Sequence, residues 1–196
     1  MPAFPAWSHE PVGGLQGLVS GFTHPLSEPA QALLLLAASL WAGQAMQVRL
    51  AAVLPILGIS LLCGALFGLV RLVDPAPASL VALAIACILG LASAARLAPP
   101  AGILMPSLVA AAAVAGIVCV PDPGPLGAVV TSSLGALFGA ILLVSVVVPV
   151  VRWSALPARA VPLGIAIRVA GSWIAAASLM AGALAFTNLA GVAPAG

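Results

Sequence analysis

The sequence predicts an all-α integral membrane protein, in which six transmembrane helices pack as an antiparallel bundle with both chain ends outside. Three observations predict this fold. Hydrophobic residues fill 63% of the 196 positions, more than a soluble domain of this size can bury. The apolar residues fall in runs of helical length separated by short gaps. Arginines and acidic residues collect in alternate gaps.

The apolar runs set the expected helices, because a helix needs about 20 residues to cross about 30 Å of hydrocarbon. We expect spans near residues 28–48, 50–70, 79–97, 102–120, 126–151 and 168–187. Residues 28–187 are then a six-helix transmembrane domain. An external segment over 1–27, with His, Gly and Pro residues, precedes it, and a short external tail over 188–196 follows it.

Proline and serine mark several of these boundaries. Ser27 and Pro29 suit the first turn of a helix, since serine accepts a hydrogen bond there and proline has no N–H to leave unpaired. Pro157 and Pro162 predict a loop or an interfacial segment over residues 153–167, which places Arg168 at the membrane boundary. The alternative is a last span that begins near residue 161 and carries Arg168 into the bundle.

The charged residues predict the orientation. One set of gaps contains no acid and five arginines: Arg49, Arg96, Arg152, Arg159 and Arg168. The opposite set contains Arg71 and all four acidic residues. Because basic residues remain on the cytoplasmic side, we expect a multi-pass protein of the bacterial inner membrane with both ends outside.

Composition also limits the function. The net charge of +2 is too small and scattered for a surface that binds nucleic acid. No nucleophile–base pair, Walker loop or dinucleotide fingerprint occurs, so we expect no enzyme and no cofactor. The expected partners are membrane lipid and the helices of other membrane proteins, which pack well against small uncharged residues.

Small residues recur at a spacing of four, as in Gly64 with Gly68 and Gly135 with Gly139. This spacing favours close helix packing within the chain, and homo-oligomerisation is the alternative. A polar group near the start of the fifth span, including Thr131 and Ser132, could line a narrow path. Hydroxyls in membrane helices more often bond their own backbone.

The segment that enters the first span contains the candidate metal ligands. His24 and Glu28 are four residues apart, and His9 lies upstream. An imidazole and a carboxylate can share nickel, copper or zinc if the spacing is helical. Pro25 and Pro29 argue against a continuous helix, so the alternative is a set of exposed polar residues at a helix entrance.

Residues 17–44 resemble the opening of the HupE/UreJ family of nickel permeases associated with hydrogenase and urease. In that family the first span typically begins with GF-x-HP and ends in a Leu-Trp-Ala-x-Gln stretch. The matching residues are Gly21, Phe22, His24, Pro25, Leu40, Trp41, Ala42 and Gln44. The resemblance implies a six-helix membrane fold and nickel as the transported ion.

The metal signatures of the family are incomplete here. An Asp-His pair is expected six and seven residues after His24, where this chain has Ala30 and Gln31, and Glu28 replaces a glycine. The His-rich second signature has no counterpart, since the region around residues 116–127 contains no histidine. Two functions follow: an accessory subunit of a larger membrane complex with a degraded metal site, or a permease for nickel or another small solute.

Overall fold

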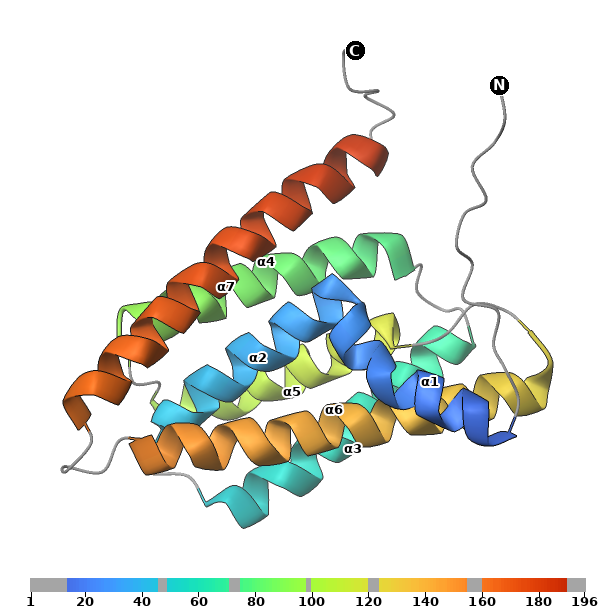
Figure 1. Cartoon of the computed structure of the whole chain (residues 1–196), viewed down its shortest axis with the longest axis horizontal. Coiled ribbons are helices and arrows are strands. Elements are labelled where there is room, and N and C mark those ends of the chain that lie inside the picture. The colour runs from blue at the N-terminus through green and yellow to red at the C-terminus, as the bar shows by residue number, and fades with distance from the viewer. Residues whose placement is uncertain are drawn as a thin grey trace.

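The computed structural model describes residues 14–45, 49–70, 75–97, 100–119, 124–154 and 160–189. In this part of the chain all regular structure is helical (Figure 1). The seven helices are α1 (Gly14–Ser27), α2 (Pro29–Gln44), α3 (Leu50–Leu69), α4 (Pro75–Ala94), α5 (Ala101–Val118), α6 (Leu126–Ser154) and α7 (Ala160–Leu189). The predicted all-α class is confirmed.

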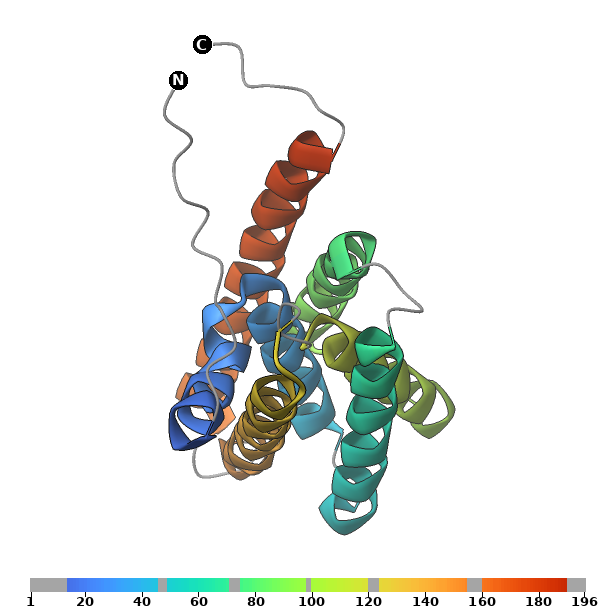
Figure 2. The same ribbon diagram turned by 90° about the vertical axis from the view of Figure 1, so that its right-hand side faces the viewer.

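Helix α2 lies at the centre of the molecule. It packs against α4, α5, α6 and α7, and Figure 2 shows it surrounded by other helices. Its sequence is apolar around most of its circumference, and 11 of its 16 residues are buried. A helix with apolar side chains on all sides is expected inside a bundle.

Around α2 the other helices form three close pairs, α1 with α6, α3 with α5, and α4 with α7. Each pair meets at glycines where an added Cβ would lie less than 3.0 Å from the backbone of the partner helix. These glycines are Gly21 and Gly135 between α1 and α6, Gly64 and Gly116 between α3 and α5, and Gly90 and Gly171 between α4 and α7. The close packing predicted within the chain from the small-residue spacing is confirmed.

Within the described ranges, four helices are long and apolar enough to cross a membrane, over Ala51–Leu69, Ala76–Ala94, Leu126–Ser154 and Leu163–Thr187. A shorter apolar helix runs over Gly102–Val118. The fold leaves large apolar side chains exposed on these helices, such as Phe138 at 61% and Trp173 at 75%. Hydrocarbon is the solvent that suits such a surface. The count of six spans stays a prediction.

One end of the bundle collects the arginines that the structure describes: Arg49, Arg96, Arg152 and Arg168. We call it the basic end. There Nη2 of Arg152 donates to the carbonyl of Ala45 at 3.1 Å, and Nε of Arg168 donates to the carbonyl of Ala94 at 3.1 Å. Both carbonyls lie at helix C-termini, where backbone acceptors have no donor within the helix. Arg71 and Arg159 lie outside the described residues.

The predicted loop over residues 153–167 is wrong at both ends, because α6 continues to Ser154 and α7 begins at Ala160. Residues 155–159 lie outside the described residues. Pro162 is the third residue of α7, in the first turn, where a backbone nitrogen has no intrahelical acceptor. Proline therefore breaks no hydrogen bond there. Arg168 consequently lies within α7, as the alternative reading required.

Within the segment over residues 1–27, where the sequence predicted no membrane span, residues 14–27 form α1 and pack along α6. Its external location stays a prediction. Residues 1–13 and 190–196 lie outside the described residues.

Candidate functional site

The junction between α1 and α2 contains two of the three candidate metal ligands. His24 lies in the last turn of α1, and Glu28 is the single residue between the helices. The backbone of Glu28 is extended, with φ −91° and ψ 108°. Pro29 explains this conformation, because a proline disfavours the helical region for the residue before it. The helical hydrogen-bond pattern of α1 nevertheless continues to this residue, since the Glu28 N–H donates to the His24 carbonyl at 3.0 Å.

The side chains of His24 and Glu28 are both half-buried. Together they offer two ligand groups, whereas a transition-metal site usually has at least three protein ligands. Across the described ranges, no group of three or more His, Cys, Asp or Glu side chains could hold a metal ion. His9 lies outside these ranges, so a site of His24, Glu28 and His9 stays a prediction.

Gln31 lies one turn into α2 and is fully buried, at 0% exposure. Its Nε2 donates to the carbonyl of Ala115 in α5 at 3.2 Å. In a continuing α-helix the Ala115 carbonyl would accept the N–H of Cys119. Here that N–H donates to the Gly116 carbonyl instead, at 3.1 Å. Gln31 therefore caps the C-terminus of α5. The side chain of Cys119 lies beside the same amide.

The region of α2 around Gln31 is thus a packing contact. Ala30 is 3% exposed and contributes only a methyl group. These two positions are where the family resemblance implies an aspartate and a histidine. In this chain Ala30 offers no ligand atom in its side chain, and Gln31 directs its amide nitrogen to a backbone carbonyl.

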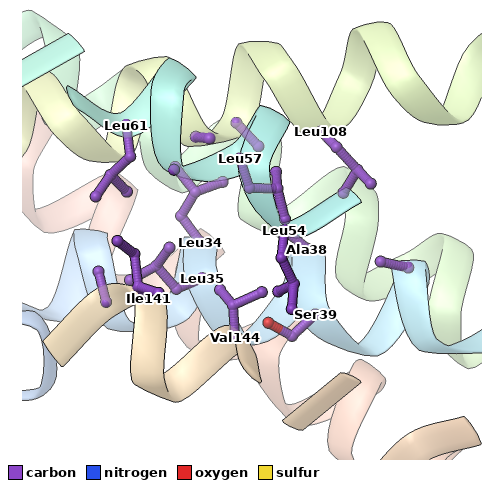
Figure 3. Close-up of a pocket in the computed structure, with 15 residues that line it drawn as sticks. Leu34, Leu35, Ala38, Ser39, Leu54, Leu57, Leu61, Leu108, Ile141 and Val144 are labelled. Atoms are coloured by element: carbon purple, nitrogen blue, oxygen red, sulfur yellow. The ribbon is translucent and has the colours of Figure 1, made fainter. Parts of the chain in front are cut away.

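A cavity of about 30 Å³ lies between α2, α3, α5 and α6 (Figure 3). Its walls are aliphatic, and Ser39 is the single polar side chain among the lining residues. The Ser39 hydroxyl is buried and has no hydrogen-bond partner among the described residues. One water molecule needs about 10–15 Å³ of cavity volume, so this cavity has room for about two water molecules. It offers no set of ligands to an ion.

Among the hydroxyl groups near the start of α6, Thr131 bonds to its own helix, whereas the buried Ser133 hydroxyl has no hydrogen-bond partner among the described residues. Thr131 Oγ1 donates to the carbonyls of Gly127 at 2.9 Å and Ala128 at 3.0 Å. In α7, Ser172 Oγ likewise donates to the Val169 carbonyl at 2.8 Å. For Thr131 and Ser172 this confirms the self-bonded interpretation and gives no support to a polar path.

Sequence reasoning assigned no structural role to Gln31. A signal for it existed, because an amide within a run of apolar residues is costly unless it is hydrogen-bonded. The partner could not be identified from the sequence, since 84 positions separate Gln31 from Ala115.

Comparison with known proteins identifies a family. A family model described as HupE / UreJ protein matches residues 1–181, which is nearly the whole chain. No curated protein and no solved structure gives a comparable match.

Proposed function

The chain belongs to the HupE/UreJ family, and from this premise we propose that it is an accessory subunit of a larger, metal-handling membrane complex. In this role it contributes helix packing and does not itself carry nickel across the membrane. The proposal includes six spans in a bacterial inner membrane, with the basic end facing the cytoplasm, because arginine-rich ends remain on that side.

The observation that supports this role is the Gln31 contact. At the depth where the family places metal ligands, α2 of this chain presents a methyl group and an amide that caps α5. Divalent transition metals are held by imidazole, thiolate and carboxylate groups, and by enough of them to replace bound water. An amide that donates to a backbone carbonyl stabilises the bundle instead.

The outer surface of α7 suits helix partners in the membrane. Trp173, Leu179 and Met180 are 75%, 68% and 74% exposed, and the C-terminal part of α7 extends away from the bundle in Figure 1. Within a membrane, association of helices depends on van der Waals packing and occasional hydrogen bonds. Helix α7 makes its main contact with α4 and is uncharged beyond Arg168, so most of its C-terminal surface is left for such contacts.

Uptake of radioactive nickel tests the proposal. Cells that express the chain, its His24→Ala variant or an empty vector are compared at matched protein levels in the membrane. Thr23→Ala, at an exposed neighbouring position, serves as the control variant. We expect the same uptake in all of these cells. Uptake above the vector level that persists in Thr23→Ala and disappears in His24→Ala would contradict the accessory role.

Extraction in mild detergent followed by native mass measurement tests the partner. We expect the chain to migrate with at least one other membrane protein. Migration of the chain alone under every mild condition would refute the subunit proposal.

A permease for nickel or another small solute is the second candidate, and the break between α1 and α2 favours it. Broken helices are common in transporters, where their free ends line the substrate site. His24 and Glu28 lie at this break and are half-buried. In this case the His24→Ala variant loses uptake that the unmodified chain shows.

A further inference from the structure

Two arginines meet where α4 ends against α7. Arg96 follows the last turn of α4 and has a φ of +56°, a left-handed conformation that non-glycine residues rarely adopt. Its guanidinium lies over Gly164 of α7, where Nη2 is 2.9 Å from the position that a Cβ would occupy. Arg168 is one turn further along α7, and its Nε donates to the carbonyl of Ala94 at 3.1 Å. The side chains therefore converge from both helices.

Within the part of the chain that the structure describes, no acidic side chain lies near the two guanidinium groups. Residues four apart on a helix, such as Gly164 and Arg168, have Cβ positions about 5–6 Å apart. Arg96 and Arg168 are thus close enough to repel each other, most strongly near lipid, where the dielectric constant is low. Glu28 is the one acidic residue in the part of the chain that the structure describes, and it lies at the α1–α2 junction.

A groove of about 290 Å³ lies beside these charges. It is lined by Ala94, Ile165, Arg168, Val169 and Ser172. Arg168 uses Nε for the Ala94 carbonyl, which leaves the donors on its two terminal nitrogens available. Ile165 and Val169 are 58% and 48% exposed and provide an apolar wall next to those donors. The groove therefore combines anion recognition with a surface for hydrocarbon.

We propose that this α4–α7 groove binds an anionic phospholipid, with the phosphate between Arg96 and Arg168 and an acyl chain against Ile165 and Val169. Guanidinium and phosphate form short, charge-assisted hydrogen bonds, often bidentate. The bound phosphate relieves the repulsion between the arginines. A lipid with net negative charge is favoured over a zwitterionic one, because a zwitterionic headgroup brings its own cation to a site that already has two.

Gly164 is part of the site although it has no side chain. The space above it holds the guanidinium of Arg96, and an added methyl group would overlap Nη2. Gly164→Ala therefore displaces Arg96 and leaves both positive charges in the protein. This variant therefore separates the effect of the Arg96 position on lipid binding from the effect of the net charge.

Native mass spectrometry of the purified chain, with phosphatidylglycerol or phosphatidylcholine added, tests the proposal. We expect one tightly bound phosphatidylglycerol and at least about fivefold weaker binding of phosphatidylcholine. In the Arg96→Gln/Arg168→Gln double variant the preference for phosphatidylglycerol disappears and its affinity falls about tenfold. Gly164→Ala reduces the affinity in the same direction. Arg49→Gln, which removes one charge from the same end at the α3 N-terminus, changes little.

Three results would overturn the inference. One is an equal loss of phosphatidylglycerol in Arg49→Gln and in the double variant, because general attraction to the basic end would then explain binding. The second is equal binding of the two lipids by the unmodified chain. The third is displacement of phosphatidylglycerol by millimolar inorganic phosphate, which would identify a site for the free anion. Thermal unfolding without added lipid checks that each variant is folded before its binding is compared.

Discussion

Replacement of Gln31 by leucine tests whether this amide holds α2 to α5. Leucine has a similar volume, so the core packing remains and the capping hydrogen bond to the Ala115 carbonyl is lost. Gln31 and Ala115 are both 0% exposed, so no solvent can take over as donor. A buried polar group left without a partner costs about 1–3 kcal/mol, and hydrogen bonds within membrane proteins average about 0.6 kcal/mol. Leucine also removes the Gln31 Oε1, which is buried without a hydrogen-bond partner among the described residues, so we expect a net loss of about 1–2 kcal/mol in unfolding free energy.

Gln44→Leu is the matched control in the same helix. Gln44 Nε2 donates to the Ser93 carbonyl at 3.3 Å, but that carbonyl also accepts the N–H of Arg96 at 3.1 Å. Its loss should therefore cost under about 1 kcal/mol. Thermal unfolding in mild detergent measures both variants, at about 2–4 °C per kcal/mol for a chain of this size. The capping argument would be refuted if Gln44→Leu lowered Tm as much as Gln31→Leu does, or more.

Two further predictions concern packing. Gly64→Ala should sharply reduce the yield of monodisperse protein, because the new Cβ would overlap the Ala113 carbonyl. The control Gly102→Ala, with open space around the new Cβ, should purify normally. Similar yields of the two variants would contradict the close α3–α5 contact. Ser39→Ala should leave Tm unchanged or raise it by a few degrees, because it removes a buried hydroxyl without a partner; a clear fall in Tm would mean that the hydroxyl has a partner, such as a water in the cavity.

Hydropathy predicted the helical segments well where charged residues or prolines bound an apolar run, as for α3 between Arg49 and Arg71 and for α5 between Pro100 and Pro121. It failed where proline occupies a first turn. Pro75 begins α4 and Pro162 lies in the first turn of α7, so both helices start earlier than a rule that treats proline as a breaker allows. Helix α1 was missed because it contains three glycines and Pro25, and because packing against α6 stabilises it more than local propensity does.

The candidate site was predicted only in part. The position of His24 and Glu28 at a helix break follows from Pro29, a local effect that the sequence reveals. The cap that Gln31 provides for α5 depends on two segments meeting in three dimensions. The meeting of Arg96 with Gly164 is equally non-local. Such contacts cannot be derived from spacing along one helix.

The pairing of α1 with α6 has a consequence for biosynthesis. The two helices are adjacent in the fold, but 99 positions separate the end of α1 at Ser27 from the start of α6 at Leu126. At about 5–20 residues per second, a ribosome needs roughly 5–20 s to make that stretch. During this interval the glycine face of α1 has no partner within the nascent chain. Assembly of the amino-terminal segment therefore finishes late, although it is translated first.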